Sequence, residues 1–295
     1  MGPNRQGADT LASTFVFGSG EECPDEPYCL PALLATYGLT FGSFVVTDPG
    51  GPVTVEALRS GRIDVGVLFT TDPRIATEDF VVLEDDRRAQ PAENVTPIVR
   101  DELLAAHGPE LRDRIDAVSE GLTTSALVDL NRRMDSDGSD ARSVARSYLA
   151  EVGLLPARTM ATSAGGPTIV VGSANFSESA TLGELYAVAL AAWGFPVTCR
   201  VDIGNREAYF PVLRDGGVGL VPDYVGSLLG YLDANAAASP EVTVAHDALR
   251  GALAGSGLTP CTPAGATTTN GIVVARATAS RHGLTRVSDL GRPVD

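Results

Sequence analysis

Short apolar runs alternate with longer amphipathic stretches along nearly the whole chain, and no other feature restricts the fold as much. The runs have the length of buried strands and lie at residues 14–17, 44–46, 63–68, 80–84, 95–100, 168–171, 197–202, 218–221 and 271–275. The stretches between them carry apolar residues three and four positions apart, most clearly at 178–193 and 141–152. This is the period of a helix that packs on one side. Strands separated by helices of this size predict an α/β fold with mainly parallel sheets that are flanked by helices on both faces.

Two segments of the chain are similar to each other. Residues 58–72 read LRSGRIDVGVLFTTD and residues 213–227 read LRDGGVGLVPDYVGS. Each has a helix end, a glycine turn, a short strand and a loop with an aspartate, although such units also recur by chance. A chain of 295 residues is long enough for one large or two medium domains, and the similarity suggests two comparable lobes. Residues 157–167 have no periodicity and are rich in small and polar residues, which is typical of a linker.

The charge of the chain excludes some classes of partner and of chemistry. The formal net charge is −15, and binding to a phosphate backbone needs clustered cations, so we expect no nucleic-acid partner. All 22 basic residues are arginine, which excludes a P-loop lysine and a lysine Schiff base. No apolar run approaches the roughly 20 residues of a membrane-spanning helix, and the first residues do not resemble an export signal. Two locations stay open: the cytoplasm, or an extracytoplasmic location after an export signal has been removed.

The cysteines and the missing catalytic motifs argue against a metal site, a cofactor and an enzyme. Cys23 and Cys29 lie in one loop, ECPDEPYC, whose five-residue spacing matches no standard zinc site. A local disulfide is the better interpretation if the protein works outside the cytosol, and Cys199 and Cys261 read as buried thiols. The chain contains no G-x-S-x-G, G-x-G-x-x-G or H-E-x-x-H motif.

Polar and aromatic residues gather just after several predicted strands. In open parallel sheets, ligands bind at the carboxyl ends of the strands. Each of these loops, taken alone, could be an ordinary turn, but four of them together predict a cleft between two lobes that holds a small ligand. The candidate ligand-binding residues are Gly18, Ser19, Phe69, Thr70, Thr71, Ala174, Asn175, Phe176, Ser177, Asp223, Tyr224 and Thr268.

Several of these stretches resemble the substrate-binding proteins of glycine betaine/carnitine/choline-type ABC transporters, the OpuAC-like or ProX-like group. The family's opening, a strand followed by G-S-x-N-F-[ST]-E and then G-E-L-Y, is similar to residues 172–178 and 183–186. The family's G-x-R-E and P-[ED]-Y-x-G elements are similar to residues 204–207 and 222–226. Residues 29–47, 70–72 and 80–100 resemble the family's closing half.

The order of these elements departs from the family's order. The chain begins with the closing half and finishes with the opening half, which implies a circular permutation joined by residues 157–167. The other interpretation of this order is a fragment that spans two tandem copies, and such a fragment would allow domain exchange between molecules. The resemblance implies a bilobal, type II periplasmic-binding-protein fold. One lobe would contain residues 10–72 and 263–295, the other 73–156 and 168–262, with the strand at 80–84 in the second lobe and the hinge near 72–73 and 261–265.

The resemblance also implies a function. Family members hold a quaternary ammonium between aromatic faces, and Tyr224 and Phe69 match two positions of such a box. We therefore expect non-catalytic binding of a betaine-, choline- or carnitine-like compound, an ABC transporter permease as partner, and an extracytoplasmic location beside the membrane. An enzyme on the same bilobal fold is a second hypothesis, for which the strand-end loops offer only Glu21, Asp72, Asp223 and hydroxyl groups. A domain-exchanged interaction protein with a decayed pocket is the third.

Overall fold

The chain divides into two compact units. The computed structural model describes residues 10–48, 50–137, 140–158, 160, 166–236 and 239–294. Unit 1 contains the stretches 1–91 and 269–295, and unit 2 contains residues 92–268. The chain therefore passes from unit 1 to unit 2 after residue 91 and returns after residue 268.

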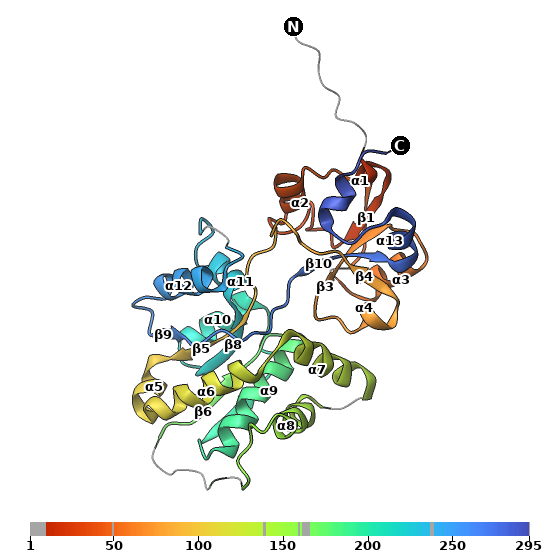
Figure 1. Cartoon of the computed structure of the whole chain (residues 1–295). Coiled ribbons are helices and arrows are strands. Elements are labelled where there is room, and N and C mark those ends of the chain that lie inside the picture. Colours follow the sequence, from red (N-terminus) through yellow and green to blue (C-terminus); the bar gives the residue numbers. More distant parts are fainter. Residues whose placement is uncertain are drawn as a thin grey trace. The chain divides into compact units, whose positions relative to one another are not determined.

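Unit 1 is built from both ends of the described chain around a five-stranded sheet in the order β2-β1-β3-β10-β4. Figure 1 shows this mixture, because a blue strand, β10, lies among red and orange strands. The strands are β1 (Val16–Ser19), β2 (Ser43–Val46), β3 (Val65–Phe69), β4 (Phe80–Val82) and β10 (Asn270–Ala275). The helices are α1 (Leu11–Thr14), α2 (Leu30–Tyr37), α3 (Pro52–Arg59), α4 (Arg74–Thr77), α13 (Arg276–His282) and the 3₁₀ turn η1 (Val287–Gly291).

The sheet of unit 1 has a hydrophobic core on each face. Phe17 and Ile272 lie in one cluster with side chains of α1, α2 and α13. Leu68 and Val273 lie in the other cluster with side chains of α3. Neighbouring residues of one strand point to opposite faces, so Ile272 and Val273 of β10 serve different cores. This is the two-sided burial that uninterrupted apolar runs predict.

Unit 2 is built around a second five-stranded sheet, in the order β7-β6-β8-β5-β9. Its strands are β5 (Val95–Arg100), β6 (Ile169–Gly172), β7 (Val197–Arg200), β8 (Leu220–Tyr224) and β9 (Leu258–Pro260). The helices that precede β6 are α5 (Asp101–His107), α6 (Pro109–Gly121), α7 (Thr124–Asp137) and α8 (Ala141–Glu151). The later helices are α9 (Ser177–Ala192), α10 (Arg206–Arg214), α11 (Val225–Leu232) and α12 (Val242–Ala252).

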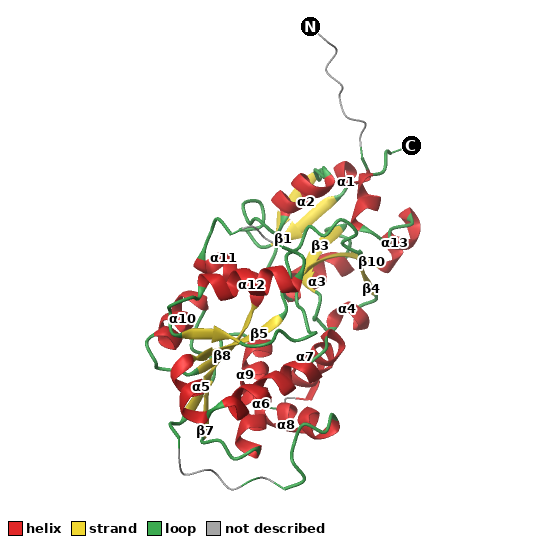
Figure 2. Cartoon of the chain, turned by 60° about the vertical axis from the view of Figure 1, so that its left-hand side comes forward, coloured by secondary structure: helices red, strands yellow, loops and turns green. Residues whose placement is uncertain are grey.

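Helices cover both faces of the unit 2 sheet. Val95 and Val99 of β5 pack in one core with side chains of α5 to α9, whereas Ile98 packs in a second core with side chains of α10 to α12. Figure 2 shows the two sets of red helices, with the yellow strands β5 and β8 between them. Helix α9 is buried on nearly every side, because α6, α7 and α8 also pack against it.

The two units share one topology. In each, three strands are parallel to one another in the order second, first, third, and an antiparallel strand follows, with a last strand at the edge. The antiparallel strand is β10 in unit 1 and β5 in unit 2. Each of them is the strand that follows the chain's passage from the other unit. The α/β class with helix-flanked sheets is thus confirmed, and the sheets are mixed rather than purely parallel.

The boundaries of the units differ from the sequence-based expectation. The strand at 80–84 was expected in the second lobe, but β4 pairs with β10 in the sheet of unit 1. Phe80 also belongs to a core of unit 1. The passages between units lie at 91/92 and 268/269, rather than near 72–73 and 261–265, because the chain completes its edge strand before it leaves unit 1.

The two ends of the described chain lie side by side in unit 1. Thr10 forms an antiparallel bridge with Pro293, and the backbone N–H of Leu11 donates to the carbonyl of Arg292 at 2.8 Å. Most of the expected linker at 157–167 lies outside the described residues. The described chain resumes at residue 166, shortly before β6.

Candidate functional site

The loop between β6 and α9 is held by its own hydroxyl groups. The backbone N–H of Asp202 donates to Ser173 Oγ at 3.0 Å, and the N–H of Ala174 donates to Ser179 Oγ at 2.9 Å. Ser173, Ala174 and Ser179 are buried. The three residues that follow Ala174 are exposed. Ala174 therefore packs in the core behind the loop, and Asn175, Phe176 and Ser177 form its accessible part.

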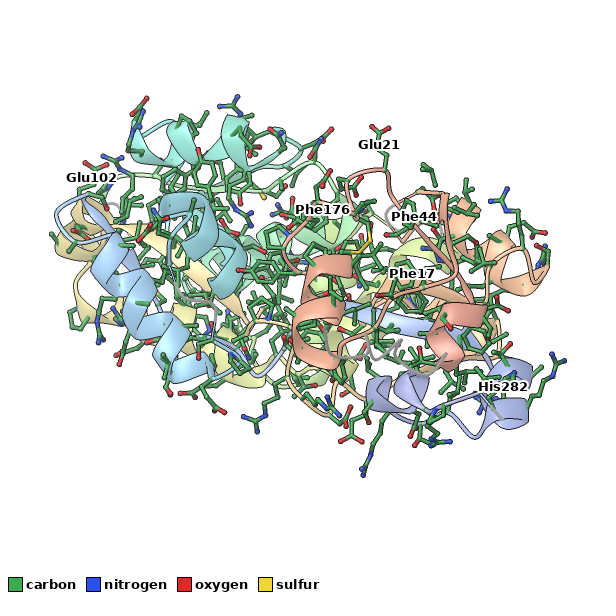
Figure 3. All side chains as sticks on the ribbon, turned by 90° about the horizontal axis from the view of Figure 1, so that it is seen from above. Phe17, Glu21, Phe44, Glu102, Phe176 and His282 are labelled. Carbon is green, nitrogen blue, oxygen red and sulfur yellow. A yellow bond between two sulfur atoms is a disulfide. The ribbon has the colours of Figure 1, made fainter. Side chains whose placement is uncertain are left out.

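An aromatic pair joins this loop to the end of β8. The rings of Phe176 and Tyr224 are stacked, with centroids 6.4 Å apart and an angle of 23° between their planes. Phe176, which is labelled in Figure 3, is 47% exposed, whereas Tyr224 is 8% exposed. Phe176 therefore offers the accessible aromatic face, and Tyr224 supports it from below.

A buried carboxylate fixes the Tyr224 ring. The Tyr224 hydroxyl donates to Glu178 Oε1 at 2.5 Å, and Asn131 Nδ2 donates to Glu178 Oε2 at 2.6 Å. Burial raises the pKa of Tyr224 well above its usual value, and the charge of Glu178 raises it further. Glu178 also lies in the first turn of α9, where the helix dipole favours a negative charge. Tyr224 is thus a neutral, oriented donor that cannot turn away without breaking its hydrogen bond to Glu178.

Asp223 lies beside this pair and its charge is compensated from two sides. Arg206 donates to Asp223 Oδ1 at 2.8 Å, and the Tyr209 hydroxyl donates to Oδ2 at 2.6 Å. The N–H of Tyr224 also donates to Oδ1 at 2.7 Å. The side chain of Asp223 is only 1% exposed and that of Arg206 is 23% exposed. Asp223 therefore holds the end of β8 against α10 and is already fully hydrogen-bonded.

A second buried acid, Glu93, lies where the chain enters unit 2. Ser227 Oγ donates to Glu93 Oε1 at 2.8 Å, and Glu93 Oε2 has no hydrogen-bond partner among the described residues. Burial raises the pKa of Glu93 to about 7, against the opposing effect of the hydrogen bonds from Ser227. The backbone carbonyl of Glu93 accepts from the N–H of Thr268 at 3.2 Å. Thr268 is thus part of the paired entry and exit segments of unit 2, next to the bridge between Asn94 and Thr267.

In unit 1 some of the predicted ligand-binding residues line a pocket, and the others are buried or hydrogen-bonded within the unit. Gly18 is buried, and a Cβ there would lie 2.6 Å from Ile63 Cδ1, so close packing explains this glycine. The hydroxyl of Thr70 already has a partner within unit 1, because its Oγ1 accepts a hydrogen bond from the N–H of Thr269 at 3.0 Å. Thr71 is buried. Ser19 and Phe69 are the two that line a cavity, of about 220 Å³, at the carboxyl ends of β1 and β3.

The remaining lining of this pocket comes mainly from the loop between β1 and α2. Glu22, Glu26 and both cysteines of the loop line it, together with Gly50, Val67 and Asn270. Cys23 and Cys29 form a disulfide, with an S–S distance of 1.93 Å and a Cα–Cα distance of 5.2 Å. The pocket thus has an acidic rim, one aromatic face and a covalently closed loop, and none of its lining residues is basic.

The carboxylates considered for catalysis either pair with an arginine or lie outside the pocket lining. Asp72 pairs with Arg74 at 2.5 Å, and Asp223 is compensated as described above. Glu21 projects from the ribbon in Figure 3 and does not line the pocket. Within the described ranges, no three His, Cys, Asp or Glu side chains are grouped so that they could hold a metal ion.

A comparison with protein families covers nearly the whole chain. The model described as the substrate binding domain of the ABC-type glycine betaine transport system matches residues 7–151 and 167–295. The protein belongs to this family.

Curated proteins that are named for binding glycine betaine or carnitine match parts of the chain. The glycine-betaine-binding protein of Pseudomonas aeruginosa is 30% identical over 143 residues, which is 48% of this chain and 46% of that protein. The glycine betaine-binding protein YehZ of Escherichia coli is 26% identical over 145 residues, 48% of this chain and 47% of that protein. The carnitine transport binding protein OpuCC of Listeria monocytogenes is 30% identical over 93 residues, 32% of this chain and 30% of that protein. The chain spans about half the length, or less, of the curated relatives it matches.

Solved structures share a lower sequence identity with this chain than the curated proteins do. Apo YehZ from Escherichia coli has 14% identity and a TM-score of 0.39, over 96% of this chain and 86% of that one. The periplasmic VFT2 domain of BvgS from Bordetella pertussis has 11% identity and a TM-score of 0.42, over 95% of this chain and 86% of that one. Among the described residues, no helix has both the length and the apolar character to cross a bilayer.

Sequence reasoning placed the loops of this family member correctly at strand ends but missed the residues that support them. Glu178 and Arg206 lie within stretches that resemble the family. Tyr209 follows Arg206 by one turn of α10, so the two side chains share a helix face, and this spacing could have indicated that both support the site. Asn131 had no such signal, since it comes from α7, 47 positions before its partner. Glu93 was also missed, because nothing in its neighbourhood in the sequence marks it as buried.

Proposed function

We propose that the protein binds a small quaternary-ammonium or related zwitterionic compound of the betaine, choline or carnitine kind for uptake by an ABC transporter. It binds this ligand without catalysing a reaction. The stacked pair of Phe176 and Tyr224 is the observation that carries this proposal. A quaternary ammonium cannot donate hydrogen bonds, so an aromatic face is its natural partner, worth about 0.5–2 kcal/mol. The curated family members whose names mention glycine betaine or carnitine support the ligand class.

The buried network explains why Phe176 can serve as such a face. A ring that must hold a cation gains affinity when it is already fixed before binding. Tyr224 is fixed by Glu178 and by burial, and it supports Phe176. The nearby carboxylate of Asp223 is satisfied by Arg206 and Tyr209, so it is not a free base. These contacts favour binding over catalysis.

The location and the partner follow from the same proposal. A substrate-binding domain delivers its ligand to a permease, and we place this delivery outside the cytoplasm. The disulfide between Cys23 and Cys29 supports an oxidising compartment.

Isothermal titration calorimetry with choline, glycine betaine and carnitine tests the ligand class. We expect saturable binding of at least one of the three. The matched control is 3,3-dimethylbutan-1-ol, which has the shape of choline without its charge, and it should bind at least tenfold more weakly, since tenfold corresponds to about 1.4 kcal/mol. No binding of any of the three, or equal binding of the neutral alcohol, would refute the proposal.

We also propose that the chain is a circular permutation of the family order. The family match is split at residues 152–166, around the expected linker, and the curated matches each span half of a relative or less. The bridge between Thr10 and Pro293 brings the described ends of the chain together. Ends that lie this close can be joined by a short linker with little loss of stability. A rearranged chain, opened within 157–167 and joined from residue 294 to residue 10, should fold and bind the same ligand. A rearranged chain that does not fold would contradict the permutation but not the ligand class.

A further inference from the structure

The pocket of unit 1 carries a charge pattern that bears on the choice of ligand. Two carboxylates, Glu22 and Glu26, stand at its rim, and no hydrogen bond or ion pair within the described part of the chain engages either of them. No basic residue lines the pocket. The rim therefore carries an uncompensated negative charge in a pocket that is also lined by an aromatic ring, Phe69, which is 46% exposed.

The loop that carries the two glutamates is held in place. Backbone N–H groups of Asp25 and Glu26 donate to the carbonyl of Glu22, at 3.0 and 2.9 Å. The disulfide closes the same loop between Cys23 and Cys29. A Cβ at Gly20 would lie 2.3 Å from Glu22 Oε1, so the glycine gives the Glu22 carboxylate room to fold back. The acidic rim is thus a built feature of the pocket.

A buried hydroxyl in the pocket is the second, independent sign of a ligand. Ser19 is 4% exposed and lines the pocket, yet no group among the described residues hydrogen-bonds to its Oγ. The Ser19 hydroxyl is therefore available to hydrogen-bond a ligand hydroxyl, and the amide of Asn270 also lines the pocket.

We propose that this pocket makes the protein prefer a quaternary-ammonium alcohol, such as choline, over a zwitterion that carries a carboxylate, such as glycine betaine. The inference rests on the proposed function and narrows its ligand class. The uncompensated carboxylates of Glu22 and Glu26 attract a net positive charge and repel a ligand carboxylate. Phe69 offers a face to the ammonium, and Ser19 offers a hydrogen bond to the ligand hydroxyl.

Calorimetric titration of choline, glycine betaine and tetramethylammonium tests the preference. The wild-type protein should bind choline at least tenfold more tightly than glycine betaine. The double variant Glu22→Gln/Glu26→Gln should reduce this ratio at least tenfold, because it removes the two negative charges that attract the net positive charge of choline and repel the carboxylate of glycine betaine. The matched control is Glu21→Gln/Asp25→Asn, which removes two charges from the same loop outside the pocket lining and should change the ratio less than twofold.

A single variant separates the hydroxyl from the charge. Ser19→Ala should weaken choline about fivefold, the loss of one hydrogen bond, and leave tetramethylammonium, which has no hydroxyl, within twofold. A wild-type preference for glycine betaine, or a ratio that Glu22→Gln/Glu26→Gln leaves unchanged, would overturn this inference while the proposed function stands. No binding of choline, glycine betaine or tetramethylammonium would refute this inference, and it would refute the proposed function only if carnitine also fails to bind.

Discussion

The two units have the same strand order but build the ends of their strands in opposite ways. In unit 2 the acids near the loop, Glu178 and Asp223, are buried and hydrogen-bonded, and they fix an aromatic pair. In unit 1 the acids, Glu22 and Glu26, are exposed and unpaired, and a disulfide fixes their loop. The shared topology therefore determines where the loops lie, and the loop residues determine what each unit can recognise.

The difference also concerns stability. A buried, fully satisfied polar network stabilises one geometry, but it is costly to break at any point. In unit 1 a disulfide holds the loop covalently, and both of its cysteines also lie in the hydrophobic core. Substitutions that break a polar contact should therefore reduce the stability of unit 2 more than that of unit 1.

The largest expected effect comes from breaking the ion pair between the partly buried Arg206 and the buried Asp223 in unit 2. Arg206→Met leaves the carboxylate of Asp223 buried without its cation, and such a change costs about 3–5 kcal/mol of unfolding free energy. Urea denaturation measures this loss. The matched control in unit 1 is Arg276→Met, which removes the exposed pair with Asp79 (57% and 73% exposed) and should cost less than about 1 kcal/mol. Equal losses for the two variants would contradict the contrast between the units.

The next effect depends on pH. The pKa of Glu93 is raised to about 7 in the folded protein, from an ordinary value of 4.5, so the folded state binds this proton more tightly than the unfolded state. The stability that Glu93 contributes is complete below pH 4.5, falls as the pH rises to 7, and stays low above it. A shift of this size corresponds to roughly 3 kcal/mol. Glu93→Gln should therefore be more stable than the wild type at pH 8 and equal to it at pH 4, as measured by urea denaturation across this range.

The control for Glu93 is an exposed acid of the same unit. Arg100 hydrogen-bonds to Glu102 and lowers its pKa, so any contribution from Glu102 increases with pH rather than decreasing. Glu102→Gln (Glu102 is labelled in Figure 3) should lose a little stability at neutral pH and none in strong acid. Parallel stability curves for wild type and Glu93→Gln would show that Glu93 is not a buried charge.

A smaller effect is expected from the disulfide of unit 1. The bond closes a loop of sequence separation 6, and closure of so short a loop stabilises by about 2 kcal/mol in the chain-entropy account. Cys23→Ser/Cys29→Ser should lower the free energy of unfolding by this amount, and dithiothreitol should destabilise the wild type but not the variant. A wild type that is indifferent to reductant would mean that the loop is held by its backbone hydrogen bonds alone.

The sequence was informative where local chemistry decides the structure. Strand runs and the helical period at 178–193 predicted helix α9 and, among the residues that the structure describes, nine of the ten strands within a few residues, because their burial follows a regular spacing. The loops after β1, β3, β6 and β8 were also predicted, since glycine and polar residues mark the ends of strands.

The parts that could not be predicted depend on partners far apart in the sequence. An apolar run such as 80–84 does not reveal which sheet it joins, and β4 joined β10, almost 200 positions away. The short edge strand β9 has only three residues, too few for a period. Glu178 could be read as part of a family-like stretch, but its contacts with Tyr224 and Asn131 appear only when α7, α9 and β8 are packed together.

The most direct test of the account is the affinity of Phe176→Ala for choline and glycine betaine, measured by calorimetry beside a matched aromatic control. Tyr231 is also an exposed aromatic residue of unit 2, 39% exposed, and it packs on Phe210 instead of on Tyr224. We predict that Phe176→Ala weakens the tighter ligand about tenfold, the upper part of the range for one cation–π face, while Tyr231→Ala stays within twofold of wild type. If Phe176→Ala binds as tightly as wild type, the aromatic pair is not the ligand's contact and the central claim is wrong.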